Sequence, residues 1–164
     1  MVEEQIDWRK TVEAILENAN RPFVPISKSF VQQPRGSKER SSVLSQFVTN
    51  GDLRGLKAYL LIAASASSPD TENEWYTSLP LQTWARAFGC SETAGSIATA
   101  KAAATRILLR LQQRGLIEKS RCGKERKIKI KLLAQDGSGE EYQRPASRYI
   151  RLSHDFWKSR FDED

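Results

Sequence analysis

Apolar positions recur with helical spacing over most of the chain, and strict alternation appears only close to residue 130. A rough apolar stripe over residues 3–19 predicts an N-terminal helix, which either packs on its own domain or forms a dimer contact. Residues 23–30 are typical of a short strand that leads into a turn or helix, and residues 41–48 of a short helix. Residues 53–67 are apolar on most faces, so they predict a buried helix.

The next segment combines a loop rich in breakers with a helix. Residues 68–77 include Pro69 and several polar residues, which favours a loop. Ser78 then suits a helix N-cap, with Pro80 in the first turn. Apolar spacing after Pro80 predicts a helix that ends near Gly89 and is built around Leu81, Trp84, Ala85 and Phe88.

Residues 91–114 predict a long helix, although Gly95 leaves its starting point open. One side of this helix is apolar, with Ile97, Ala100, Ala104, Ile107, Leu108 and Leu111. The opposite side is small, hydroxylated and basic, with Thr99, Ala103, Arg106 and Arg110. A surface helix without an external role more often carries Glu–Lys pairs, and Ala102 and Ala103 allow a close backbone approach. This helix is therefore expected to press against another surface.

Gly115 supplies a helix stop, and a strand, a basic turn at 121–124 and a second strand are expected to follow it. In the second strand Ile128, Ile130 and Leu132 alternate with Lys127, Lys129 and Lys131. This alternation predicts a half-buried strand with one cationic face. Residues 134–146 then predict a loop, residues 148–152 a short strand and residues 153–160 the start of a helix.

The length suits one domain with accessory segments. We expect an N-terminal helix at 1–20, a strand, loop and short helix at 21–52, a core at 53–133, and a loop, strand and helix at 134–164. Two eight-residue segments that begin at Phe23 and at Tyr149 share a pattern of aromatic, β-branched and serine positions. Either the last segment begins a second repeat of a tandem protein, or the two similar segments are symmetric flanks of one domain.

Positive charge is concentrated in the long helix and the hairpin. Eleven Lys or Arg and two Glu lie between Lys101 and Lys131, a local charge of +9 against +6 for the whole chain. Such a cluster is the electrostatic footprint expected on nucleic acid. The sequence contains no apolar run of about 18 residues that would span a membrane. The acidic start has no apolar signal region, and two cysteines without a CxxC spacing indicate a reduced, cytoplasmic setting.

Enzymatic chemistry is not expected, because no acid, base, nucleophile or metal set is gathered in the sequence. The single histidine, His154, is interpreted as a surface residue. Cys90 is expected in the core, whereas Cys122 lies among cations, either as an incidental turn residue or as a redox-sensitive thiol. These dispersed residues do not form a zinc site, and no glycine-rich phosphate loop is present, so neither a metal nor a cofactor is predicted.

Two segments carry a resemblance to winged helix-turn-helix DNA-binding proteins. The sequence LQTWARAFGCS, residues 81–91, resembles their support helix and turn. The sequence TRILLRLQQRGLI, residues 105–117, is similar to the end of the recognition helix and the first wing strand of MarR-type regulators. The resemblance implies an α+β, mostly helical fold with a two- or three-stranded antiparallel wing sheet and an extra N-terminal helix.

By this resemblance, helix 96–114 enters the major groove and wing 119–129 contacts the backbone. Ala102, Ala103, Thr105 and Arg106 would lie at or near base edges, and Arg114 would add a phosphate contact. The separation of Ser91 from Gly115 is longer than a compact recognition helix needs, which leaves open the contacts at its N-terminal end. The full set of candidate residues is Ser96, Thr99, Lys101, Ala102, Ala103, Thr105, Arg106, Arg110, Arg114, Arg121, Lys124, Arg126 and Lys127.

The sequence therefore predicts a cytoplasmic, nucleoid-associated protein that binds specific double-stranded DNA as a homodimer or in several copies. Transcriptional regulation, most simply repression by occupancy, is the first role expected. Replication initiation or partition of a mobile element is an alternative in the same physical class, because initiators often use tandem winged helices. From another class, a protein-interaction adaptor would place its basic face on an acidic partner. No residue indicates an effector ligand.

Overall fold

The computed structural model describes residues 8–17, 23–32, 42–67, 75–90, 95–122, 127–143 and 149–153. The protein is α+β, and about half of the described residues are helical, which is less than the mostly helical fold that was expected. In chain order the elements are α1 Trp8–Glu17, β1 Phe23–Ile26, α2 Lys28–Val31, α3 Val43–Thr49, α4 Leu53–Ser65, β2 Tyr76–Pro80, α5 Leu81–Ala87, α7 Ile97–Gln113, β3 Ile117–Cys122, β4 Lys127–Leu132 and β5 Ile150–Ser153.

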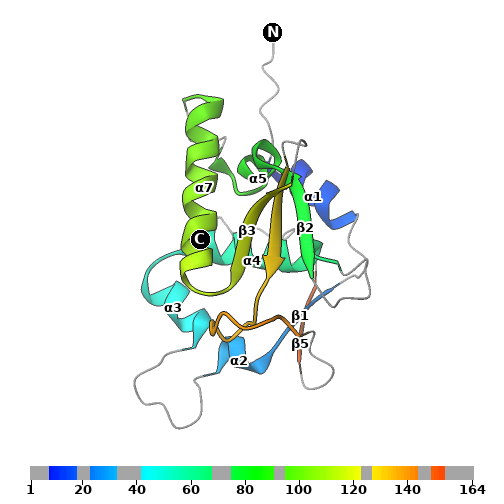
Figure 1. The fold of residues 1–164 in the computed structure, drawn as a ribbon, viewed down its shortest axis with the longest axis vertical. Coiled ribbons are helices and arrows are strands. Elements are labelled where there is room, and N and C mark those ends of the chain that lie inside the picture. The colour runs from blue at the N-terminus through cyan, green and yellow to red at the C-terminus, as the bar shows by residue number, and fades with distance from the viewer. Residues whose placement is uncertain are drawn as a thin grey trace.

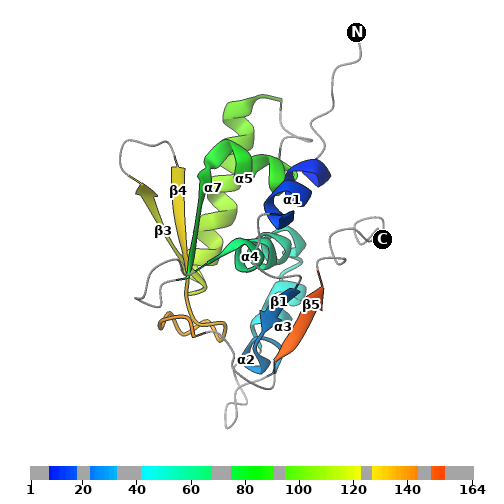
Figure 2. The same ribbon diagram turned by 90° about the vertical axis from the view of Figure 1, so that its right-hand side faces the viewer.

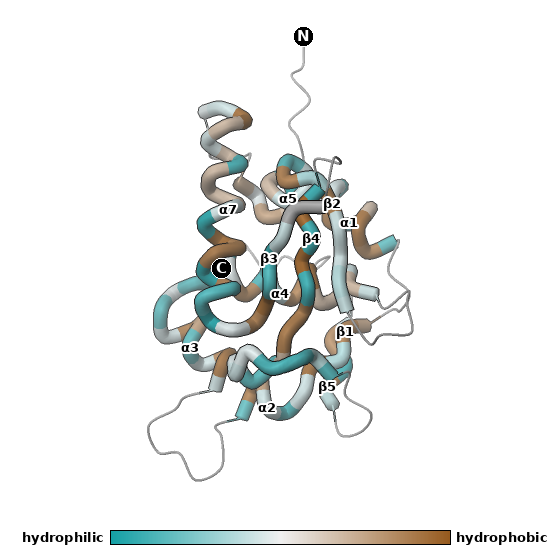
Figure 3. Tube along the Cα trace, in the orientation of Figure 1, coloured by the Kyte–Doolittle hydropathy of each residue, from teal (hydrophilic) through white to brown (hydrophobic). Residues whose placement is uncertain are grey.

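Helix α4 forms the centre of the core, as its apolar sequence predicted. Tyr59 and Ile62 are fully buried, and Leu61 is almost so. Because α4 is apolar on most faces, α7, α1 and one face of a three-stranded sheet can all pack around it. Figure 3 shows hydrophobic positions gathered where α4, the lower part of α7 and the sheet meet.

The N-terminal helix packs on its own chain. Val12, Ile15 and Leu16 form the apolar stripe of α1, and all three are buried among the core residues. Helices α4 and α5 are the elements that contact it. Packing is thus the role that the structure shows for this stripe. Residues 3–7 and 18–19 of the predicted helix lie outside the described residues.

The main sheet is antiparallel, with strand order β2–β4–β3. In the hairpin register Lys119 lies opposite Ile130, and Ile128, Ile130 and Leu132 share one face of β4 because they occupy alternate positions. Ile130 and Leu132 are buried, and Lys127 is exposed. The half-buried strand predicted from alternation is therefore confirmed.

The prediction that the loop extends to residue 77, and that Ser78 is a helix N-cap, is wrong, and residues 68–74 of the predicted loop lie outside the described part of the chain. Strand β2 spans Tyr76–Pro80, and Ser78 lies opposite Lys129 in the sheet. Helix α5 begins at Leu81 with Pro80 as its N-cap. Proline has no backbone N–H to donate, so it is tolerated at the end of this edge strand and immediately before a helix.

The two segments with a similar pattern lie side by side. Strand β1 pairs with β5 in a two-stranded antiparallel sheet, in a register that places Phe23 opposite Ser153 and Ile26 opposite Ile150. The rings of Phe23 and Tyr149 are stacked, with centroids 6.3 Å apart. This sheet lies below α4, away from the free end of α7 (Figure 2). The start of a second repeat in residues 134–164 stays a prediction, and the predicted helix at 153–160 lies almost wholly outside the described residues.

Candidate nucleic-acid interface

A side-chain cap fixes the start of α7. Ser96 is the N-cap, and its Oγ accepts a hydrogen bond from the Thr99 backbone N–H at 3.2 Å. The two hydroxyl oxygens of these residues also lie 2.9 Å apart. The helix therefore begins at Ile97, after the glycine that left its start open in the sequence. Residues 91–94 lie outside the described part of the chain.

One side of α7 anchors it to the protein. Helices α5 and α4 pack against this side. Its buried residues, which the apolar spacing predicted apart from the exposed Ile97, are Ala100, Ala104, Ile107, Leu108 and Leu111. The end of the helix is equally fixed, because Gly115 has a φ of 72° and terminates it where the sequence predicted.

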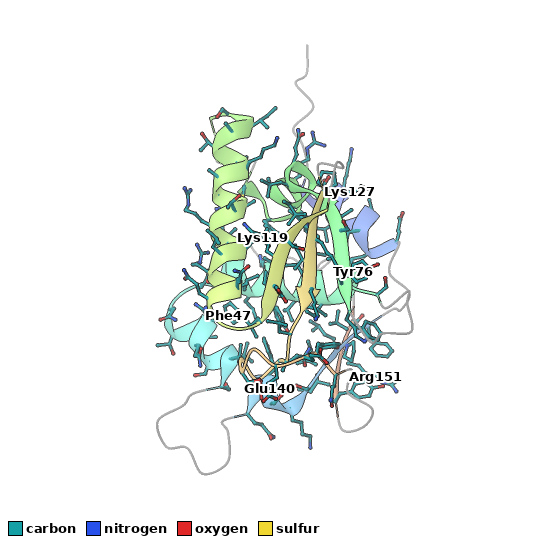
Figure 4. All side chains as sticks on the ribbon, viewed as in Figure 1. Phe47, Tyr76, Lys119, Lys127, Glu140 and Arg151 are labelled. Atoms are coloured by element: carbon teal, nitrogen blue, oxygen red, sulfur yellow. The ribbon has the colours of Figure 1, made fainter. Side chains whose placement is uncertain are left out.

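The C-terminal half of α7 is held on one flank by Asp52, the N-cap of α4. Arg110 Nη2 lies 3.0 Å from Asp52 Oδ1, and Arg114 Nη2 lies 3.5 Å from Asp52 Oδ2. The same carboxylate accepts a hydrogen bond from the Gly55 N–H at 3.1 Å. The Arg114 guanidinium carbon also lies 4.3 Å from the centroid of Phe47, which Figure 4 marks near this end of the helix. These contacts join α7 to the corner between α3 and α4.

The other flank of α7 is joined to the sheet. Gln112 Oε1 accepts a hydrogen bond from the Lys119 backbone N–H on β3 at 3.1 Å. Figure 1 shows α7 standing beside β3. Between the two flanks lies a strip of exposed residues at helical spacing, which we call the outward face: Ala98, Ala102, Arg106, Leu109 and Gln113.

This outward face is shifted from the side that the sequence predicted. Arg106 belongs to both, but Ala103 is half-buried and packs against the core. Arg110 remains 43% exposed while it pairs with Asp52. The shift arises because the α3–α4 corner covers one flank, so the exposed face is not centred opposite the apolar stripe. Leu109 and Gln113 were missed for this reason.

The remaining candidate residues of α7 differ in their exposure. Ser96, Thr99 and Ala102 are exposed, in line with a role at the surface. Lys101 and Thr105 are half-buried, and the Thr105 hydroxyl donates to the Lys101 carbonyl at 2.9 Å. The Arg114 side chain is only 18% exposed, so its charge lies mostly within the protein.

The hairpin presents its charge on the sheet face that points away from the helices. Lys127 is exposed, and Lys129 and Lys131 are half-buried on the same face. The Lys129 ammonium lies 4.4 Å from the ring centroid of Tyr76 on β2. The candidate residues Lys124 and Arg126, and the side chain of Arg121, lie outside what the structure describes.

Three arginines act electrostatically on Cys90, which follows the end of α5. Burial raises the pKa of the Cys90 thiol, and the positive charges of Arg54, Arg106 and Arg110 oppose that rise. Cys90 is buried, as expected from the sequence. Arg54 was not predicted for the site because it lies on α4, which β2 and α5 separate from α7 in the sequence. It is exposed, and its charge acts on the Cys90 thiol together with that of Arg106.

Among the described residues, no three His, Cys, Asp or Glu side chains are grouped to hold a metal ion. His154 and the Cys122 side chain are outside the described part, so the hypothesis of a redox-sensitive Cys122 stays a prediction. None of the helices in the described ranges is long and apolar enough to cross a membrane. No family model, curated protein or solved structure matches this chain.

Proposed function

We propose that this protein binds specific double-stranded DNA through the outward face of α7 and the β3–β4 hairpin, and that it acts as a transcriptional regulator. The order α4, β2, α5, α7, β3 and β4 supports a winged helix-turn-helix, with β2 as the third strand of the wing sheet. In such a unit α7 enters the major groove, which admits a helix and displays a distinct pattern at each base pair.

One observation carries the proposal: α7 is anchored on three sides and projects an exposed, acid-free face on its fourth. The buried side, Asp52 and the Gln112–Lys119 hydrogen bond fix its orientation. The helix contains no Asp or Glu, so nothing on it repels a phosphate backbone. Its N-terminal half stands above the body of the protein, at the end where β3 finishes and β4 begins (Figure 1).

Within the outward face Arg106 is the residue best suited to specific contact. It is exposed, and its five N–H donors match the two acceptors that guanine presents in the major groove. Ala102, one turn before it, is also exposed and leaves room for the helix axis to approach the base edges. Replacing Arg106 by alanine is expected to cost about 1–3 kcal/mol at one base position.

The test is fluorescence anisotropy on the upstream DNA of the gene and on a scrambled duplex of equal length, over a salt series from about 50 to about 200 mM. Wild type is compared with Arg106→Ala and with Lys124→Ala/Arg126→Ala. Lys28→Ala is the matched control, because Lys28 is exposed on α2, and α2 lies at the opposite end of the protein from the end where β3 finishes and β4 begins.

The proposal expects wild type to prefer the upstream DNA, Arg106→Ala to relax that preference, and the hairpin variant to weaken both duplexes evenly. Lys28→Ala should behave as wild type. Equal and weak binding of wild type to both duplexes would exclude specific recognition of this DNA, and would favour a protein-interaction adaptor.

A further inference from the structure

The face of the three-stranded sheet that points away from the helices carries a straight row of lysines. Lys127, Lys129 and Lys131 occupy alternate positions of the central strand β4, so all three lie on this outer face. Figure 2 shows the sheet as an outer layer of the protein, with α4, α5 and α1 on its other side. The row spans about 14 Å from the first lysine to the last, at the strand rise of about 3.4 Å per residue.

The neighbours of the row on β2 and β3 include several hydroxylated residues. On β2, Ser78 lies opposite Lys129, and the Tyr76 ring faces the Lys129 ammonium at 4.4 Å. On β3, Ser120 lies opposite Lys129. Glu118, opposite Lys131, is the one acidic residue among the described positions of the outer face. The described part of this face is therefore cationic and hydroxylated.

We infer that the outer face is a second contact for the DNA phosphate backbone, which continues from the outward face of α7 across β3 to Lys127, Lys129 and Lys131. This inference rests on the proposed function and extends it. It predicts a longer binding site than α7 alone requires, because the duplex must reach past the major-groove contact to the sheet. The two-residue rise between successive lysines is close to the separation of successive phosphates along one strand.

The composition of the face favours a phosphate backbone over an acidic protein. The exposed large hydrophobic residues of the described chain are Val48, Leu53, Ile97, Leu109 and Ile150, and none of them is on this face. The centres of protein interfaces are depleted of lysine and enriched in aromatic and apolar residues, unlike this surface. Lysine, in contrast, neutralises phosphates as a flexible point charge.

The face is also poorly suited to a single strand. Proteins that bind single strands stack successive bases on several aromatic side chains. Tyr76 is the one aromatic residue among the described positions of the outer face, and the Lys129 ammonium already lies over its ring. The row therefore fits the backbone of a duplex.

The first measurement is acetylation of lysines in the wild-type protein, with and without a duplex of random sequence about 30 base pairs long. Mass spectrometry would give the acetylation rate of each lysine. Lys129 and Lys131 are expected to react several-fold more slowly in the complex. Lys10 and Lys28, which are exposed on α1 and α2, are internal controls whose rates should not change. Unchanged rates at Lys129 and Lys131 in a saturated complex would overturn the inference.

The second measurement compares duplexes of about 12 and about 30 base pairs with wild type, Lys129→Gln/Lys131→Gln and Lys129→Arg/Lys131→Arg. The affinity of the glutamine variant for the longer duplex should fall by on the order of tenfold. The slope of its log binding constant against log salt concentration should decrease by the equivalent of about two phosphate contacts. The arginine variant should retain wild-type behaviour. A glutamine variant that matches wild type on the longer duplex would overturn the inference.

The two measurements separate this inference from the proposed function, because they use a random sequence. Protection of Lys129 and Lys131 without any preference for the upstream DNA would support the outer-face contact and contradict specific recognition there. A sequence preference that depends on Arg106, without protection of the lysines, would support specific recognition and contradict the outer-face contact. Failure of wild type to bind any duplex would overturn both.

Discussion

Gly55→Ala is expected to destabilise the protein, although alanine is normally the better helix former. A glycine inside a helix costs about 1 kcal/mol relative to alanine, so intrinsic propensity alone predicts a gain of that size. In this protein a Cβ on Gly55 would lie 2.7 Å from Asp52 Cγ and 2.9 Å from Asp52 Oδ1. No real Cβ tolerates such distances, so the carboxylate must move.

Moving the carboxylate disrupts three interactions at once. Loss of the hydrogen bond from the Gly55 N–H removes the N-cap of α4, a contribution of about 1 kcal/mol. The pair with Arg110 is partly exposed and contributes less than about 1 kcal/mol. Arg114 is more enclosed, and its Nη1 is buried without a hydrogen-bond partner even in the wild-type protein. Separating its Nη2 from Asp52 would leave the enclosed guanidinium without its ion pair, which costs about 1–2 kcal/mol. Against the propensity gain, the net expectation is a loss of about 1–3 kcal/mol.

Urea unfolding followed by circular dichroism would measure this loss as a lower midpoint at unchanged slope. The matched control is the same substitution in an Asp52→Ala background. There the obstructing carboxylate is absent, and Gly55→Ala should stabilise the helix by about 1 kcal/mol. The difference between the two backgrounds is the coupling energy between the residues. A stabilising Gly55→Ala in the wild-type background would refute the reasoning, since it would show that the carboxylate contributes little where it lies.

Two further predictions concern backbone geometry and burial. Gly115 and Gly139 both have positive φ, but only at Gly115 would a Cβ meet backbone, 2.6 Å from the Gly137 carbonyl oxygen. Gly139→Ala should therefore cost about 1 kcal/mol and Gly115→Ala at least about 2 kcal/mol in urea unfolding, and equal costs would contradict the packing argument. Because burial raises the pKa of Cys90, its contribution to stability is complete below the ordinary thiol pKa of about 8.5 and is lost as pH rises above it. Cys90→Ala should flatten the fall in unfolding free energy between about pH 7.5 and about pH 9.5, and an identical slope in both proteins would argue against a buried thiol.

The elements that could be predicted well from the sequence are those with a repeated local pattern. Helix α4 is apolar on most faces, and α7 repeats its apolar positions over four turns, so each could be located from its own residues. Strand β4 alternates lysine with isoleucine or leucine for its whole length. In each case the pattern is long enough to outweigh a competing local preference.

Strand β2 could not be predicted because its partner is distant. It is short, and its hydrogen-bonded neighbour β4 follows some fifty residues later in the register that pairs Tyr76 with Lys131. Locally, a serine two residues before a proline resembles a helix start more than a strand end. The pairing of β1 with β5 was hidden in the same way: the similarity of the two segments was visible, but not that they pair with each other.

The orientation of α7 shows why local pattern also misplaced part of the candidate site. An apolar stripe identifies the buried side of a helix, and its opposite side is the exposed one only if both flanks are equally open. Here Asp52, far away in the sequence, closes one flank through Arg110 and Arg114. The helix is thereby divided into a C-terminal half whose arginines hold it in place and an N-terminal half that is available to a partner.

This division also changes what the charge of the segment means. The +9 between Lys101 and Lys131 includes Arg110 and Arg114, which share one carboxylate within the protein. Counterion release depends on cations that reach phosphates, so the salt dependence of the proposed DNA binding should reflect fewer contacts than the local charge suggests. Under the proposed function, the cations best placed to contribute are Arg106 on α7, the exposed Arg54 on α4 and the lysines of β4. An Asp52→Ala variant would free Arg110 and Arg114 but loosen the helix that presents Arg106, so it should strengthen the salt dependence of binding while it weakens the preference for a specific sequence.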